Sequence, residues 1–165
     1  MGLPSSENQS DYPRIRAVEA SHIGDLIRIG AETNLSPWTA EGYLDEMKST
    51  DAIMLRLVAD DNATIGFIVG RSIIGGDVHK RIDAEIYNIA VAETEQRQGR
   101  GQLLFDAFTD VCKEREVANI WLEVRESNHK AISFYERNGF ERTQTRRSFY
   151  DNPREHALLM KLTVK

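Results

Sequence analysis

QRQGRG, at residues 96–101, is the most informative stretch of this chain of 165 residues. An apolar segment, residues 86–91, leads into it. Apolar residues at helical spacing follow it, namely Leu104, Phe108, Val111 and Cys112. A strand, a glycine-bearing turn and a helix in this order aim free backbone N–H groups at a phosphate. Glycines let the main chain approach such a ligand closely, because they carry no Cβ.

Two familiar nucleotide motifs do not fit this turn. A Rossmann fingerprint requires a third glycine and an acidic residue about 20 positions later, and a P-loop requires a Lys-Ser or Lys-Thr pair. Neither continuation follows Gly101. The remaining pattern, R/Q-x-x-G-x-G/A, resembles the pyrophosphate-binding turn of the GNAT family of acyl-CoA N-acyltransferases. On the motif alone, a solvated turn remains the alternative.

Composition and charge narrow the function classes. The chain is long enough for one domain, and its content of 41% hydrophobic and 28% charged residues is typical of a globular protein. Its net charge of −5 argues against general nucleic-acid binding and suits a cationic substrate such as an amine. Because the sequence contains neither a signal peptide nor a membrane-length apolar run, we expect a cytoplasmic protein without a membrane partner.

The histidines and the single cysteine predict no metal site and no disulfide. His22, His79, His129 and His156 are scattered, without the spacing of metal ligands. Cys112 falls on the apolar stripe of the expected helix, which predicts a buried structural thiol rather than a nucleophile.

The order of the expected elements is β-α-α-β-β-β-α-β-α-β-β, which indicates an α/β fold with a mixed sheet flanked by helices. We expect a flexible leader over residues 1–12 and a single domain over residues 13–165. The expected strands cover residues 14–18, 53–59, 64–72, 84–91, 119–125, 141–148 and 157–164, with a loop at residues 75–77. Four helices are expected: one capped by Ser21, one capped by Thr39, one from about Gly99 to Glu116, and one capped by Ser127-Asn128 and closed by Gly139.

One carboxylate in an otherwise apolar strand is a candidate catalytic group. Side chains alternate across a strand, so Ile120, Leu122 and Val124 share one face and Glu123 lies on the other, with Trp121 and Arg125. The functional interpretation of Glu123 is a general base or a water-positioning group. The alternative is a surface glutamate on a half-exposed strand.

The segment from Asn128 to Phe140 extends the resemblance, because it is similar to the GNAT signature N-x-x-A-x-x-x-Y-x-x-x-G-F. Spacing from Ala131 and Ile132 puts Tyr135 on the apolar face of the expected helix. A core tyrosine is the structural alternative. In the family, this tyrosine protonates the leaving thiolate, and the asparagine contacts CoA. The resemblance therefore implies Tyr135 as general acid, Glu123 as general base, and acetyl-CoA as co-substrate without a metal.

Within the family, the chain is most similar to the bacterial ribosomal-protein-alanine N-acetyltransferases, on the segments 88–91, 96–101, 121–125, 127–128, 139–140 and 146–150. This resemblance implies N-terminal acetylation of a protein or peptide, for example a ribosomal protein, by direct attack of the neutral amine. It also implies these cofactor-binding residues: Ile89, Ala90, Val91, Arg97, Gln98, Gly99, Arg100, Gly101, Gln102 and Asn128.

The chain departs from this family pattern at Glu95, at Arg100 and over residues 151–157, and the last departure bears on recognition of the peptide acceptor. Acetylation of another amine, such as a lysine, a polyamine or an antibiotic, is the first alternative. A non-catalytic acyl-CoA-binding module is the second. The sequence gives neither the oligomeric state nor the role of the basic run from Arg142 to Arg154.

Overall fold

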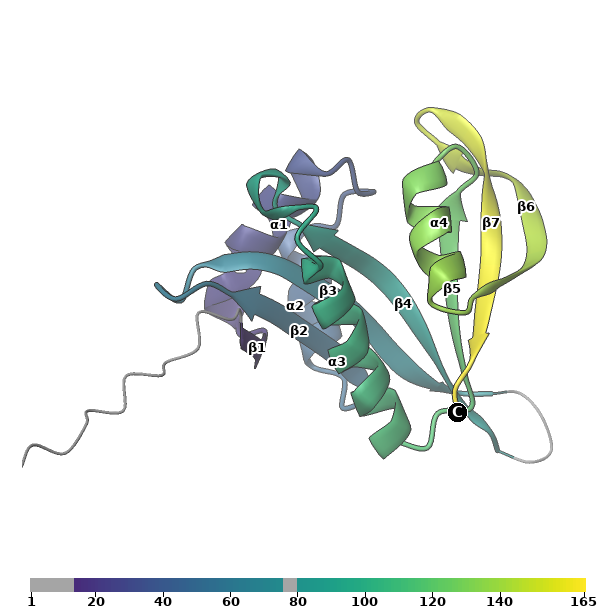
Figure 1. The fold of residues 1–165 in the computed structure, drawn as a ribbon, viewed down its shortest axis with the longest axis horizontal. Helices are drawn as coiled ribbons and strands as arrows, with labels where there is room; N and C mark the ends of the chain where they lie inside the picture. The colour runs from purple at the N-terminus through teal and green to yellow at the C-terminus, as the bar shows by residue number, and fades with distance from the viewer. Residues whose placement is uncertain (1–13, 76–79) are drawn as a thin grey trace, which may run out of the picture.

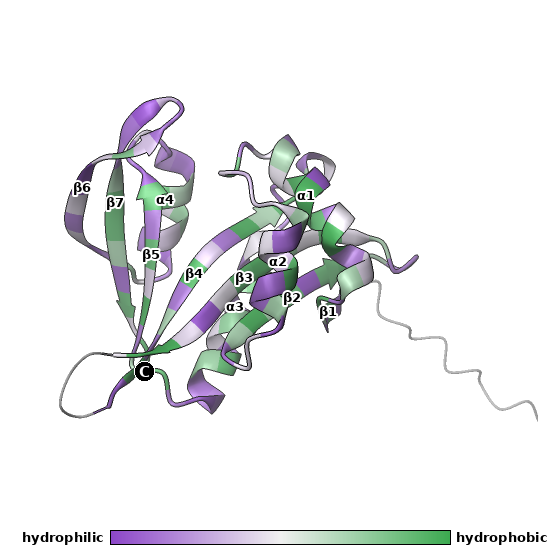
Figure 2. Ribbon diagram, turned by 180° about the vertical axis from the view of Figure 1, so that it is seen from behind, coloured by the Kyte–Doolittle hydropathy of each residue, from purple (hydrophilic) through white to green (hydrophobic). Residues whose placement is uncertain are grey.

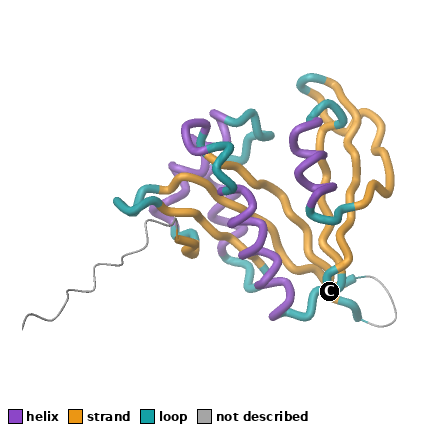
Figure 3. The backbone as a smooth tube through the Cα atoms, viewed as in Figure 1, coloured by secondary structure: helices purple, strands orange, loops and turns teal. Residues whose placement is uncertain are grey.

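A computed structural model describes residues 14–75 and 80–165 of the chain (Figure 1). The expected leader, residues 1–12, and most of the expected loop at residues 75–77 lie outside the described residues. The described part forms one seven-stranded sheet with helices on both faces (Figure 3). The fold class and the order of the elements are as predicted.

The sheet has the strand order β1-β2-β3-β4-β5-β7-β6. Every neighbouring pair is antiparallel except β4 and β5, which run parallel. The strands are β1 (Arg14–Ala17), β2 (Ala52–Val58), β3 (Thr64–Ile74), β4 (Ile82–Val91), β5 (Asn119–Arg125), β6 (Glu141–Asp151) and β7 (Arg154–Thr163).

Two helices cover each face of the sheet. On one face, α1 (Ile23–Glu32) and α2 (Ala40–Met47) pack through Leu26, Ile29 and Tyr43 against side chains of β2, β3 and β4. On the other face, α3 (Arg100–Glu114) and α4 (His129–Arg137) enclose the larger apolar core. Single 3-10 turns, η1 (Ala20–His22) and η2 (Glu93–Glu95), precede α1 and the 96–101 turn.

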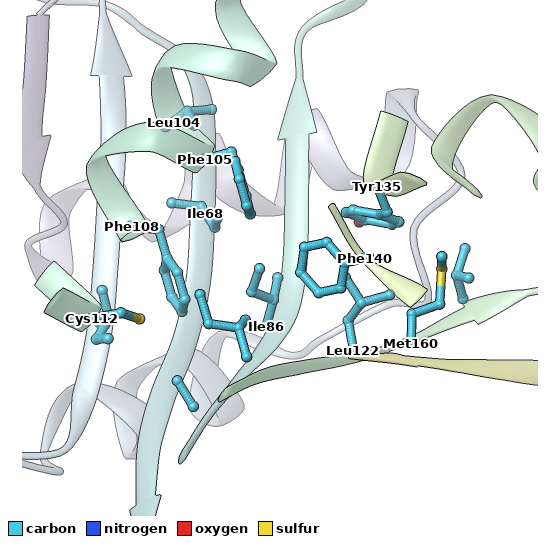
Figure 4. Packing of buried hydrophobic residues seen from close by; sticks show 14 of the residues in the cluster. Ile68, Ile86, Leu104, Phe105, Phe108, Cys112, Leu122, Tyr135, Phe140 and Met160 are labelled. Carbon is cyan, nitrogen blue, oxygen red and sulfur yellow. The ribbon is translucent and has the colours of Figure 1, made fainter. Parts of the chain in front are cut away.

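The larger core joins the two ends of the sheet (Figure 4). Phe105 and Phe108 of α3 are buried in it, with Cys112 one turn further along the helix. Burial of side chains of this size stabilises the fold by about 1.5–3 kcal/mol each. The Phe105 ring lies 6.1 Å from the ring of Phe134 and 5.9 Å from that of Phe140, so aromatic contacts link α3 to α4. Apolar residues line the sheet interior, whereas β6 is largely hydrophilic (Figure 2).

Local capping explains the start of α2 and both ends of α4. The Thr39 side chain accepts a hydrogen bond of 3.0 Å from the Gly42 N–H, and the Asn128 side chain accepts one of 3.2 Å from the Ala131 N–H. Gly139 follows α4 with φ of +90°. These three predictions are confirmed. The prediction of Ser21 as a cap is wrong, because Ser21 lies inside η1, whose N-cap is Glu19, and His22 occupies the N-cap position of α1.

The parallel pair β4 and β5 is joined over a short distance only. Asp83 to Ile86 pair with Asn119 to Leu122, and beyond these residues the two strands diverge (Figure 1). β4 remains paired with β3 on its other side, and β5 remains paired with β7. The facing edges of β4 and β5 therefore separate where β4 carries residues 87–91 and β5 carries Glu123.

A bulge at Tyr87 changes which β4 side chains face the larger core. Val69 of β3 pairs with Asn88 and Gly70 pairs with Ile86, which leaves Tyr87 as the extra residue. Before the bulge, Ile86 faces the larger core, and after it Ile89 and Val91 do. Gly70 is required opposite the bulge, since a Cβ there would lie 2.2 Å from the Glu85 carbonyl oxygen.

The last hairpin is longer than predicted, with β6 ending at Asp151 rather than residue 148 and β7 starting at Arg154 rather than residue 157. Arg146 pairs with Ala157 and Tyr150 pairs with Glu155, so residues 147–149 bulge opposite His156. The Ser148 N–H, at φ of +51°, donates to His156 Nδ1 over 2.8 Å. Because the bulge interrupts the alternation of side chains along β6, the part of β6 beyond residue 148 was not predictable from the sequence.

Candidate active site

The turn at residues 96–101 offers a row of unused backbone donors. Arg97 and Gly99 have φ of +63° and +73°, which curls the main chain immediately before α3. Among the described residues, no acceptor is within hydrogen-bond distance of the N–H groups of residues 97–102. Gly99, the N-cap of α3, contributes no capping side chain. Since a helix N-terminus and such free N–H groups attract anions, the turn is suited to a diphosphate.

Side chains hold this turn in place from three directions. Gln96 Nε2 donates to the Val91 carbonyl over 2.9 Å, which ties the turn to the end of β4. Lys130 Nζ donates to Gln96 Oε1 over 3.0 Å, which ties it to the start of α4. Gln102 exchanges hydrogen bonds of 2.7 and 3.1 Å with Asn138, at the end of α4. The side chain of Gln102 therefore joins α3 to α4, and only its backbone N–H is free for a ligand.

The charged residues of the turn differ in their surroundings. Arg97 and Gln98 are exposed. Arg100 instead forms an ion pair with Glu95 of η2. The two positions where the sequence departs from the expected motif thus compensate for each other, and Arg100 enters the turn with its charge partly neutralised.

Ile89, Ala90 and Val91 lie on β4 where it separates from β5. The side chain of Ala90 points to the face covered by α1 and α2, and that of Val91 points to the face covered by α3 and α4. The backbone of this segment is therefore adjacent to both faces of the sheet. Val91 is also the strand end to which the 96–101 turn is bonded. A ligand seated on the turn is therefore adjacent to this stretch of main chain.

Glu123 lies on the β5 face opposite the larger core, as the alternation predicted. Its side chain is 16% exposed and its carboxylate Oε1 is 2.7 Å from Arg146 Nη1. A second carboxylate, Glu85, lies on the same side, on the paired part of β4. Burial, followed by the charge of Glu123, raises the pKa of Glu85, whereas Arg146 and Arg71 oppose this effect. A cationic acceptor would meet negative charge at this position.

Tyr135 projects from α4 into the larger core, with its ring 5.5 Å from Phe140 and 5.6 Å from Phe134. Burial, followed by the nearby Tyr150, raises the pKa of Tyr135 above the usual tyrosine value. The hydroxyl therefore keeps its proton at neutral pH. Glu123 and Tyr135 thus lie on opposite faces of the sheet, near the point where β4 and β5 separate.

Asn128 stands at the start of α4, next to Lys130. Its Oδ1 is occupied by the cap on Ala131, so only its side-chain NH₂ group remains for a ligand. Asn128 thus lies between the end of β5 and α4, the helix that carries Tyr135.

Aromatic residues line the face that carries Glu85 and Glu123. The Trp38 ring lies 5.1 Å from Tyr43 and 5.5 Å from Tyr87, the bulge residue of β4. Arg71 and Glu46 form a bidentate ion pair at 2.9 and 2.7 Å beside them. This face combines carboxylates and aromatic rings, which suits a short cationic chain.

The sequence assigns no site role to four residues near Glu123, namely Glu85, Arg125, Arg146 and Tyr150. Arg146 pairs with Glu123 although 23 positions separate them in the sequence. Glu85 carried a weak signal, because it is a polar residue at an alternate position of the 82–91 strand. The contact of Arg125 with the last hairpin depends on tertiary structure and had no sequence signal.

The described residues contain neither a helix that could span a membrane nor a cluster of metal ligands. No helix within residues 14–75 and 80–165 has the length and apolar character needed to cross a membrane. In the same part of the chain, His, Cys, Asp and Glu side chains nowhere gather in groups of three that would hold a metal ion.

Comparison with known proteins identifies relatives over most of the chain. The model of the acetyltransferase (GNAT) family matches residues 24–140. A ribosomal protein bS18-alanine N-acetyltransferase of Haemophilus influenzae is 33% identical over 149 residues, which are 88% of this chain and 95% of that protein. A putative enzyme of the same name from Bacillus subtilis is 29% identical over 91% of this chain and 95% of its own length.

Solved structures agree with this similarity. The ribosomal-protein-S18-alanine N-acetyltransferase of Escherichia coli superposes with a TM-score of 0.80 at 28% identity, covering 93% of this chain and 94% of that one. Ard1 from Thermoplasma volcanium gives a TM-score of 0.81 at 28% identity, covering 93% of this chain and 98% of that one. The fold and the sequence thus point to the same group of proteins.

Proposed function

This chain belongs to the acetyltransferase (GNAT) family, and we propose that it transfers the acetyl group of acetyl-CoA to the N-terminal α-amino group of a protein, with an alanine-initiated ribosomal protein as acceptor. The Haemophilus influenzae and Escherichia coli relatives are named as N-acetyltransferases of the alanine of ribosomal protein S18, which supports this acceptor class. A ribosomal acceptor is consistent with a reaction in the cytoplasm.

The observation that carries the proposal is the row of free N–H groups at residues 97–102, next to the point where β4 and β5 separate. These donors, with Arg97 and the start of α3, fit the diphosphate of CoA. Ile89 to Val91 would then face the pantetheine, and the Asn128 NH₂ group would contact CoA near the start of α4. Acetyl-CoA supplies the acetyl group as an activated thioester.

Glu123 is proposed as the group that takes the proton from the acceptor amine. An α-amino group has a pKa near 8, so about a tenth of it is neutral at pH 7, whereas a lysine with a pKa of about 10.4 is almost wholly charged. A single carboxylate is therefore sufficient for an N-terminal amine. Its place on the face with Glu85 supports binding of the acceptor as an ammonium ion.

Tyr135 is proposed as the proton donor to the departing sulfur. The carbon–nitrogen bond forms as the carbon–sulfur bond breaks, and the thiolate takes the hydroxyl proton. Packing in the larger core supports this role, because contacts with Phe134 and Phe140 hold the ring in place and a tyrosine hydroxyl carries its proton at neutral pH. Orientation of the two reactants supplies much of the acceleration.

A peptide panel tests the proposal. Peptides that share a basic sequence but begin with alanine, serine, methionine or acetyl-alanine are incubated with acetyl-CoA and followed by mass spectrometry. We expect one added acetyl group on the alanine peptide, at its first residue, and none on the acetyl-alanine peptide. Acetylation of an internal lysine at an equal rate would favour the alternative acceptors, and absence of transfer to any peptide or small amine would favour a binding module.

A further inference from the structure

Arg125, at the end of β5, grips the end of the β6–β7 hairpin. Its Nη1 donates to the Pro153 carbonyl over 3.1 Å, and its Nη2 donates to the Asn152 carbonyl over 3.3 Å. Nη1 also lies 3.3 Å from Glu155 Oε2, and the guanidinium carbon lies 4.1 Å from the centre of the Tyr150 ring. The side chain of Arg125 is only 23% exposed, so these contacts are partly shielded from water.

Two backbone N–H groups after Arg125 also donate hydrogen bonds to the end of the hairpin. The Ser127 N–H donates to Glu155 Oε1 over 2.6 Å, and the Glu126 N–H donates to the His156 carbonyl over 3.2 Å. Hydrogen bonds from Ser127, followed by Arg125, hold the pKa of Glu155 below its usual value, so this carboxylate stays charged near neutral pH. The segment between β5 and α4 is thereby fixed to the hairpin end.

The hairpin end needs this anchor because its own ladder is short. The bulge at residues 147–149 interrupts β6, and beyond it only Tyr150 with Glu155 and Asp151 with Arg154 form pairs. Two pairs beyond a bulge do not order an isolated hairpin in water. The position of Tyr150 therefore depends on contacts from outside the hairpin, and Arg125 provides four of them.

Neighbouring side chains connect Tyr150 to Glu123. Arg125, whose guanidinium carbon lies over the Tyr150 ring, is on the same face of β5 as Glu123. Arg146, at 2.7 Å from Glu123, lies 5.7 Å from the centre of the Phe149 ring, next to Tyr150. Burial, followed by the charge of Glu123, raises the pKa of Tyr150, and Tyr150 in turn contributes to the raised pKa of Tyr135. Its ring also meets Phe149 edge-on at 5.1 Å. Tyr150 thus borders the face from which the acceptor amine reaches Glu123.

We propose that Arg125 is a positioning residue for acetyl transfer, which holds Tyr150 beside Glu123 and so shapes the acceptor side of the site. The inference rests on the proposed function only in assuming that the acceptor amine approaches Glu123. Arginine is required for two reasons. Its planar fork reaches two successive carbonyl groups while its face covers an aromatic ring, and the single ammonium group of lysine cannot do both.

Steady-state kinetics of Arg125→Lys and Arg125→Met with acetyl-CoA and the alanine peptide test the proposal. We expect the KM for the peptide to rise about tenfold, as for the loss of charge-assisted hydrogen bonds, and the KM for acetyl-CoA to stay within about twofold. Arg142→Lys is the matched control, since Arg142 pairs with Glu136 at 2.7 Å at the opposite end of β6. The control should change neither KM.

A combination with Tyr150→Leu, which removes the ring that Arg125 covers, separates positioning from general destabilisation. If Arg125 acts through Tyr150, Arg125→Lys should raise the peptide KM much less in the Tyr150→Leu background than in the wild-type background. Additive effects, an unchanged peptide KM, or equal changes in both KM values would overturn the inference. Failure of the wild type to acetylate any amine would instead refute the proposed function. Faster amide hydrogen exchange over residues 150–155 in Arg125→Lys checks the anchor without using activity.

Discussion

Arg146 Nη1 lies 2.7 Å from Glu123 Oε1, so a half-exposed arginine of β6 neutralises the carboxylate that we assign as proton acceptor. The pair joins β6 to β5 across the intervening strand β7, on the face opposite the larger core. An incoming ammonium group must share or take over this carboxylate, and the nearby Glu85 provides a further negative charge. The acceptor side is therefore set by electrostatics that involve β4, β5 and β6 together.

Glu123→Gln should lower kcat by about 100-fold to 10,000-fold, because the amide keeps the size of the side chain and cannot accept the proton. Acetyl-CoA should still raise the melting temperature, since Glu123 lies away from the 97–102 donors. The exposed Glu126, three positions further on, gives the control Glu126→Gln, which should keep wild-type kcat. Wild-type turnover in Glu123→Gln would remove the proposed role.

Tyr135→Phe should lower kcat at least about tenfold, because the departing sulfur loses its proton donor. The ring contacts with Phe134 and Phe140 are retained, so the melting temperature should stay within a few degrees of the wild type. Parallel thermal melts and initial rates measure both quantities. A large loss of stability with unchanged kcat would assign Tyr135 to the core alone.

The order of elements was predictable because each element carries its own periodicity and turn chemistry. Thr39, Asn128 and Gly139 mark helix ends through local hydrogen bonds or local backbone conformation. Such local features depend on neighbouring residues and can therefore be predicted from the sequence. The Tyr87 bulge depends on how β3 pairs with β4, and the 147–149 bulge depends on His156 of the facing strand. Such features are set by the partner strand and leave no periodic signal.

The candidate site likewise combines features that follow from local sequence with features that depend on tertiary contacts. The 96–101 turn and the facing direction of Glu123 followed from neighbouring residues alone. The pair of Arg146 with Glu123, and the grip of Arg125 on the hairpin, involve residues more than 20 positions apart and needed the structure. Glu95 and Arg100 were recognised separately as departures from the motif, and their ion pair explains why they occur together.

Glu95→Gln should tighten acetyl-CoA binding about twofold to fivefold, as expected for the removal of a partly exposed ion pair near an anion site. The change frees Arg100 and removes a negative charge beside the 97–102 donors. Isothermal titration calorimetry measures the affinity. Glu93→Gln, in the same 3-10 turn but exposed, is the control and should have a smaller effect. Weaker binding in Glu95→Gln would show that the pair supports the turn instead.

Cys112 should resist alkylation in the folded protein, because it is fully buried and burial raises the pKa of its thiol to about 12. Iodoacetamide at pH 8 should label the thiol only after addition of denaturant, which intact-mass measurement detects. Rapid labelling of the native protein would contradict the buried position.

The same thiol predicts a loss of stability in alkali. The folded state keeps the proton to higher pH than the unfolded state, so the full contribution is present below pH about 9 and is lost as pH rises toward 12. Between pH 9 and 10, the free energy of unfolding should fall by about 1 kcal/mol through this group. Urea titrations should give a shallower pH dependence for Cys112→Ala, and an identical slope would contradict the prediction.

The short pairing of β4 with β5 has a mechanical consequence. The main-chain pairing between the two halves of the molecule covers only four residues of each strand, and side-chain contacts between α3 and α4 supplement it. Because main-chain pairing of this length resists torsion weakly, we expect the two halves to rock against each other at this point. A molecule that touches both separated edges should suppress this rocking, so its binding should stiffen regions far beyond the atoms that it contacts.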